Sequence, residues 1–143
     1  MILKIPALQI PNYWELIKFA GVKADGIADK DISRYAIELL LKLLDGTYGA
    51  LLSFNKDKSL NRVLIYEFYQ DKITDEKVVQ FKIMYSFNHA SKENWDEESV
   101  LVYEFAKTNN CDLVRATIRS DQLMDITEQL GGTVESKNYY IKL

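Results

Sequence analysis

The hydrophobic period of this chain changes near residue 46, and this change constrains the fold more than any other feature. Residues 32–44 repeat apolar side chains at intervals of three and four, the spacing of one helix face. From Tyr48 onward the apolar side chains run or alternate as in strands, over 48–54, 62–70 and 77–87. Because the intervening segments are short and polar, the pattern predicts an antiparallel meander of three strands.

Helices and strands are then predicted to alternate along the rest of the chain. A helix between two strands implies that those strands run parallel. We therefore expect one domain, residues 1–143, with an α/β mixed sheet (an antiparallel meander plus a parallel addition) flanked by helices. In the third strand we expect one apolar face, made of Val79, Phe81, Ile83, Tyr85 and Phe87. The expected order is helices 12–25 and 31–45, the three strands, helix 94–109, strand 111–118, helix 121–130 and strand 133–143.

Composition removes several classes of function. The chain has 18 Lys and Arg against 21 Asp and Glu, a net charge of −3, which argues against a nucleic-acid partner. One cysteine and one histidine exclude a disulfide framework and the common clustered metal sites. The longest apolar-rich stretch, Tyr35–Leu44, is far shorter than the roughly 20 residues of a membrane span. No secretory signal is evident, so we expect a cytoplasmic protein that does not bind membranes.

Two segments of the last third resemble the GNAT superfamily of N-acyltransferases. The stretch Phe-Ala-Lys-Thr-Asn-Asn-Cys-Asp-Leu-Val-Arg, residues 105–115, looks like the end of that family's third helix running into its fifth strand. Residues 120–132, which end Glu-Gln-Leu-Gly-Gly, look like its next helix, and residues 133–143 resemble its last strand. The resemblance implies that two parallel strands splay apart and hold acyl-CoA, with its pyrophosphate on a glycine-containing loop before the third helix.

The chain departs from that family pattern at the loop. Residues 88–98 contain no glycine, and the bulky Trp95 lies where the backbone should approach phosphates. Four carboxylates would oppose an anionic ligand there, and Lys92 is the only strong cation. If CoA binds, Asn88 and Lys92 are the expected contacts. The four acidic residues are Glu93, Asp96, Glu97 and Glu98.

The catalytic positions also differ. The resemblance places a tyrosine general acid before the Leu-Gly pair, where this chain has Thr127, whose hydroxyl is a poor acid. Glu67, within an apolar strand, and His89, just after the third strand, are candidate bases. A solvent-facing carboxylate and an ordinary loop histidine are the alternatives. Cys111 is expected to be a core thiol rather than a nucleophile.

Two hypotheses of function follow. The preferred one is a pseudoenzyme, a GNAT-like module without ordinary acetyl-CoA chemistry and with no cofactor, that binds a protein partner or itself. Its nine tyrosines suit an interface. Similar degenerate domains are found among bacteriophage proteins, which would make it a virion-associated structural protein in the host cytoplasm or virion. The alternative is an active N-acyltransferase that moves an acetyl group from acetyl-CoA to an amine.

Overall fold

A computed structural model describes residues 2–88 and 92–143, with the side chains of 92–94 left out. A mixed sheet forms its centre, in the order β1-β2-β3-β4-β5, and only the β4–β5 pair is parallel. The predicted fold class is therefore confirmed. Two single-turn helices precede α1 and α2. The elements are β1 (Ile2–Ile5), α1 (Ile10–Asp25), α2 (Ile32–Leu44), β2 (Gly49–Phe54), β3 (Leu60–Gln70), β4 (Lys77–Ser86), α3 (Lys92–Thr108), β5 (Leu113–Ala116) and α4 (Asp121–Gln129).

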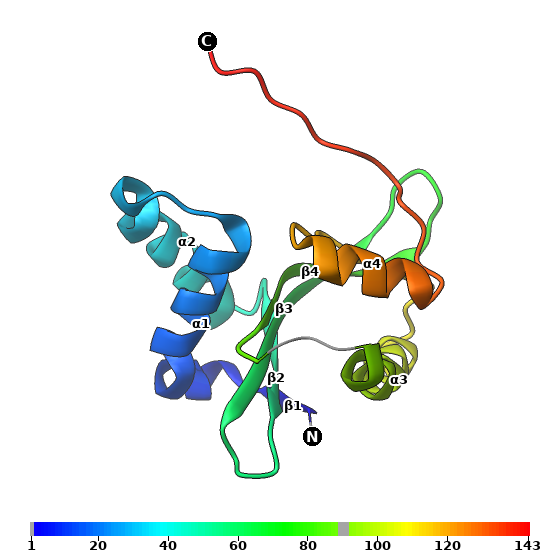
Figure 1. Ribbon diagram of the computed structural model, residues 1–143, viewed down its shortest axis with the longest axis horizontal. Helices are drawn as coiled ribbons and strands as arrows, with labels where there is room; N and C mark the ends of the chain where they lie inside the picture. The colour runs from blue at the N-terminus through cyan, green and yellow to red at the C-terminus, as the bar shows by residue number, and fades with distance from the viewer. Residues whose placement is uncertain (1, 89–91) are drawn as a thin grey trace.

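The sheet separates two layers of helices, with α1 and α2 on one face and α3 and α4 on the other (Figure 1). Each face has its own apolar core. The first includes Ile17, Leu39, Leu52, Val63 and Ile65, and the second includes Leu64, Val79, Phe81, Trp95 and Leu123. Consecutive residues of β3 thus enter opposite cores, as strand alternation requires. None of the described helices combines the length and the apolar character needed to cross a membrane.

The third meander strand, β4, departs from the predicted alternation at one residue. Ile65 pairs with Ile83 and Tyr66 pairs with Phe81, so Lys82 is an extra residue, a β-bulge. The bulge reverses the faces, because Phe81 belongs to the α3–α4 core whereas Ile83 belongs to the α1–α2 core. The single apolar face expected for this strand is therefore wrong. The prediction assumed regular alternation along the whole strand, but the bulge at Lys82 interrupts it.

The predicted last strand is also absent. Residues 130–143 form no strand, and nearly all of their side chains are exposed. The tail leaves α4 and extends away from the sheet (Figure 1). Strand-like sequence alone does not make a strand, because the backbone also needs a partner edge. The other expected elements are present, and a short strand, β1, precedes them.

A buried ion pair joins the first turns of α3 to the sheet. Arg62 of β3 lies 2.6 Å from Glu98 of α3 and is almost fully buried. The guanidinium of Arg62 also stacks on the ring of Trp95, with 4.3 Å between its central carbon and the ring centre. The hydroxyl of Ser53 in β2 donates to the same carboxylate. This one buried ion pair therefore connects β2, β3 and α3.

Removing one partner of this pair should be costly. We expect Glu98→Ala to lower the free energy of unfolding by about 3–5 kcal/mol, because Arg62 would keep a buried charge without a counter-ion. Urea unfolding followed by circular dichroism measures the loss. The matched control is Glu97→Ala, an exposed neighbour on the same helix, for which we expect a change within about 0.5 kcal/mol. Equal losses in the two variants would contradict this role for the ion pair.

Candidate functional site

The two parallel strands separate beyond one pair of residues. Their ladder ends at Phe81 and Ala116, and one more bond follows, from the N–H of Thr117 to the carbonyl of Phe81 at 3.1 Å. Beyond it, β4 continues to Ser86, whereas the chain after β5 turns into α4. The gap between them is a hollow of about 350 Å³, closed by the end of α1 and the start of α4.

Basic side chains line this hollow from three separate parts of the chain. Lys23 comes from α1, Lys82 from the bulge in β4, and Arg119 from the segment before α4. Asp25 is the one carboxylate among the described lining residues, and its Oδ2 accepts a hydrogen bond from the Tyr35 hydroxyl at 2.6 Å. Burial, and then that bond, raise the pKa of Tyr35 well above its usual range. The hollow is therefore suited to an anionic ligand.

The wall of the hollow formed by β4 offers further polar groups. Ser86 Oγ is buried and has no hydrogen-bond partner within the described part of the chain. Among the residues that the structure describes, the β5-facing edge of β4 has no ladder partner beyond Phe81, although the opposite edge stays paired with β3. Buried polar groups without partners are costly and usually mark a place where a ligand or water binds. This wall can therefore bind an extended ligand that offers hydrogen-bond donors and acceptors along its length.

The start of α3 differs from the arrangement expected from its sequence. Trp95 lies in the α3–α4 core and does not fill the turn before the helix. Glu98 faces inward and is neutralised by Arg62, so it does not face a ligand at the helix start. Glu97 stays exposed. Two of the features expected to oppose an anion are thus accounted for by packing.

The sequence-predicted ligand contacts are only partly described. Asn88 lines the hollow, and its side-chain amide donates to Asn61 Oδ1 at 3.0 Å. His89 and the side chain of Lys92 lie outside the described residues. The structure thus brings Asn88 to the gap and leaves the roles of all three as predictions.

Glu67 lies at a second hollow, on the far side of the bulge. This hollow measures about 570 Å³, and Tyr48, Tyr66 and Phe68 form its aromatic part. Glu67 Oε1 lies 2.9 Å from Lys82 Nζ, and this bond raises the pKa of Lys82. Since Glu67 lines one hollow and Lys82 lines the other, the ion pair connects the two.

Neither Thr127 nor Cys111 is presented as a reactive group. The hydroxyl of Thr127 donates to the carbonyl of Leu123 at 2.7 Å, the backbone bond typical of threonine inside a helix. Burial raises the pKa of the Cys111 thiol, which favours the unreactive protonated form. Across residues 2–88 and 92–143, no three His, Cys, Asp or Glu residues lie close enough together to hold a metal ion.

Sequence reasoning missed the basic lining of the gap. Lys82 interrupts an apolar strand, which was a signal for a special position. Lys23 and Arg119 belong to a helix end and a loop, and only the fold brings them together. Nothing in the sequence marks Ser86 as a site residue, because its position in the gap depends on where β5 separates from β4.

Solved structures with the same fold are numerous, although no family model and no curated protein sequence matches this chain. A ribosomal-protein-alanine N-acetyltransferase from Brucella melitensis biovar Abortus 2308 superposes with a TM-score of 0.70 at 15% identity, over 100% of this chain and 99% of that one. A protein described as a probable acetyltransferase gives a TM-score of 0.71 at 14% identity, over 100% and 97%. A predicted acetyltransferase from Clostridium acetobutylicum, solved with acetyl-CoA, gives 0.65 at 13%, over 100% and 94%.

These likenesses define an α/β protein with a splayed mixed sheet. The chain has the fold of the GNAT acetyltransferases, as the resemblance of residues 105–115 and 120–132 predicted.

Tyr66 offers a test of the second hollow through its ionisation. Burial raises the pKa of Tyr66 to about 12, whereas a tyrosine of the unfolded chain has a pKa near 10. Between pH 10 and pH 12, therefore, the folded state keeps the Tyr66 proton and the unfolded chain loses it. This stabilisation is complete below pH 10 and is lost as the pH rises toward 12. We therefore expect unfolding by urea to show less alkaline destabilisation in Tyr66→Phe than in the parent, by about 1 kcal/mol at pH 11.

The control for this titration is Tyr139→Phe, which changes an exposed tyrosine. It should reproduce the parent's dependence on pH. A parallel shift of both variants would show that Tyr66 is not held in a low-dielectric setting.

Proposed function

We propose that this protein binds an acyl-CoA between β4 and β5 and transfers its acyl group to an amine. The observation that carries the proposal is the gap itself, where Lys23, Lys82 and Arg119 line one hollow together with the buried Ser86 hydroxyl, which has no hydrogen-bond partner among the described residues. The lining residues fit coenzyme A, because its phosphates can bind the basic side chains and its amide-bearing arm can hydrogen-bond to the open edge of β4. The names of the similar structures agree with this class of activity.

Different parts of the gap would hold different parts of the ligand. Lys23 and Arg119, at the outer side where α1 ends and α4 begins, suit the phosphates. The open backbone edge of β4 and the Ser86 hydroxyl suit the amide arm. When bound, the group supplies an acyl carbon activated as a thioester.

In this proposal, Glu67 is the residue that accepts a proton. Its carboxylate lies at the second hollow and is held by Lys82, so it is oriented toward the boundary between the two hollows. A carboxylate there can accept a proton from an amine, directly or through one water. Tyr48, Tyr66 and Phe68 give that hollow an aromatic wall able to exclude water around the amine.

A second candidate function is the module without transfer, a pseudoenzyme that binds a partner. It is favoured by Thr127, whose hydroxyl is bonded to Leu123 and cannot replace a tyrosine acid. In this case the gap would bind the nucleotide thioester or nothing, and no thiol would be released. The bacteriophage and virion roles expected from sequence rest on resemblance alone and stay predictions.

Binding is tested by thermal shift with acetyl-CoA. At about 100 times the dissociation constant the ligand should stabilise the fold by about 2.7 kcal/mol, or roughly 5–10 °C in Tm. Arg119→Ala should raise the dissociation constant about tenfold, equivalent to about 1.4 kcal/mol. Lys72→Ala, an exposed lysine of the β3–β4 loop, is the control and should change nothing. A flat response at millimolar acetyl-CoA would sink the proposal.

Transfer is tested by release of the free thiol in the presence of amines. We expect Glu67→Gln to lower turnover about 10²–10³-fold while the acetyl-CoA shift in Tm stays as in the parent. Glu104→Gln, an exposed carboxylate on α3, serves as the control. Intact binding with no thiol release by the parent, over a broad panel of amines, would favour the module without transfer.

A further inference from the structure

Strand β3 extends past the strand that pairs with it on one side. The β2–β3 ladder ends where Gly49 pairs with Tyr66, whereas β3 continues through residues 67–70 and stays paired with β4 there. Before Gly49 the chain turns away toward α2, because the Tyr48 N–H donates to the Lys42 carbonyl at 2.9 Å. In the described part of the chain, no strand pairs with the β2-facing edge of residues 67–70, which we call the open edge of β3.

The open edge of β3 has the length and the hydrogen-bonding groups for an extended backbone. Residues 67–70 span about 13 Å at about 3.3 Å per residue. Alternate residues of a strand direct both their N–H and their C=O toward the same neighbour, so this edge presents unpaired donors and acceptors at strand spacing. In Figure 1 the loop end of the β3–β4 hairpin lies far from β1 and β2. A polypeptide added as a strand is the ligand whose own groups match this spacing.

One end of the open edge is closed by β2, and the hollow of about 570 Å³ lies at that end. Residues 46–49 and 66–68 line the hollow, so it reaches from the start of β2 to the open edge. Because β2 occupies the position beyond Gly49, a strand added to the open edge presents one of its chain ends to the hollow. Lys4, the one cation among the described lining residues, pairs with Leu51 on β1, so the width of β2 separates its backbone from β3.

Two polar groups at the hollow suit an amino end. Glu67 Oε1 binds Lys82 at 2.9 Å, and no partner of its second carboxylate oxygen is found among the described residues. Tyr66 is only 3% exposed, and within residues 2–88 and 92–143 its hydroxyl has no hydrogen-bond partner. The phenol can lie at this wall because Gly49 has no side chain, and a Cβ there would overlap it. Both oxygens can accept hydrogen bonds from an ammonium group.

We propose that the open edge of β3 binds an extended polypeptide with a free amino end, whose backbone pairs with residues 67–70 and whose ammonium group lies between Glu67 and the Tyr66 hydroxyl. The peptide runs parallel to β3, because its first residue lies beside Glu67 and later ones lie toward Gln70. The inference deepens the proposed function by naming a polypeptide amine as the acceptor, and it rests on that function for this step alone. Binding of the peptide needs no acyl-CoA.

Binding is tested by fluorescence anisotropy in the absence of acyl-CoA. The probe is a six-residue peptide rich in valine and threonine, with a free amino end, an amidated carboxyl end and fluorescein on its last side chain. We expect saturable binding below about 1 mM, weakened about tenfold when the amino end is acetylated. Methylating one set of alternate backbone amides should abolish binding, and methylating the other set should not, since only one set faces β3.

Variants of the full chain test the two polar groups. Tyr66→Phe and Glu67→Gln should each weaken binding of the free-amine peptide about tenfold while the acetylated peptide binds as it does to the parent. Glu104→Gln, an exposed carboxylate on α3, is the control and should bind both peptides as the parent does. Circular dichroism checks that each variant is folded. Hydrogen exchange of the parent with the peptide should show new protection within residues 67–70.

Three results would overturn the inference: no binding of the peptide at about 1 mM, equal affinity for the acetylated peptide, or new protection confined to other strands. If the thermal shift with acetyl-CoA is still observed in those cases, the proposed function stands without this acceptor. Peptide binding by a chain that shows no shift with acetyl-CoA would support the peptide site and contradict acyl transfer.

Discussion

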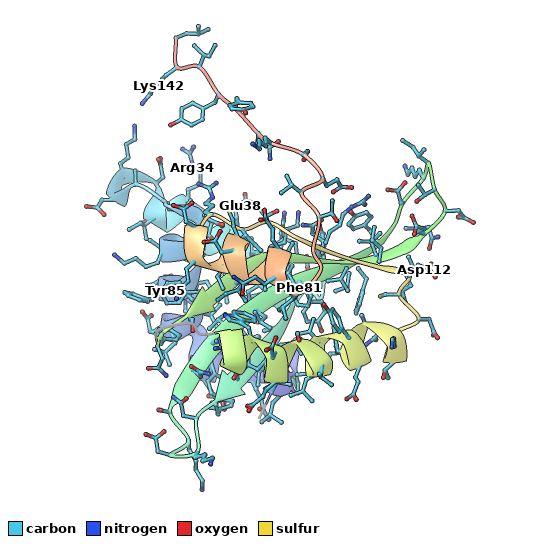
Figure 2. The ribbon with its side chains drawn as sticks, turned by 45° about the vertical axis from the view of Figure 1, so that its right-hand side comes forward. Arg34, Glu38, Phe81, Tyr85, Asp112 and Lys142 are labelled. Atoms are coloured by element: carbon cyan, nitrogen blue, oxygen red, sulfur yellow. The ribbon has the colours of Figure 1, made fainter. Side chains whose placement is uncertain are left out.

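The extra residue at Lys82 is the constraint on which the rest of the molecule depends. Up to Phe81, β4 shares its ladder with β5, and beyond the bulge the two strands separate. The same residue turns the following side chains toward the α1–α2 core, so Tyr85 packs against Phe19 of α1 whereas Phe81 lies under α4 (Figure 2). Lys82 also binds Glu67. One backbone irregularity thus opens the gap, assigns residues to the two cores and joins the two hollows.

The buried pair of Arg62 and Glu98 fixes α3 against the sheet. α3 is the next element after β4 in the chain, and this pair sets how the helix packs on β2 and β3. A charge pair buried among Ser53, Trp95 and the strands is sensitive to geometry, since neither charge can be solvated if the helix shifts. The same contact that directs Glu98 inward also removes a negative charge from the ligand side.

The sequence predicted most of the fold because its signals were local. The helical period of residues 32–44, the polar hairpin loops and the helix between β4 and β5 each depend on near neighbours, and all are present. The failures needed information from distant parts of the chain. The bulge at Lys82 is set by the pairing of β4 with β3, and the tail lacked a partner edge. At the candidate site, Glu67 and Asn88 could be named from sequence, but Lys23 and Arg119 meet only through the fold.

The bulge also limits how this chain can change in length during evolution. The face of the sheet to which each residue after Lys82 points depends on the one extra residue of the bulge. Loss of Lys82 would restore regular pairing with β3 and remove the irregularity at which β4 and β5 separate, whereas loss of another residue of β4 would move the side chains between that site and the bulge to the opposite layers. Insertions and deletions should therefore accumulate in the hairpin loops, whereas the length of β4 itself should be preserved among descendants of this sequence.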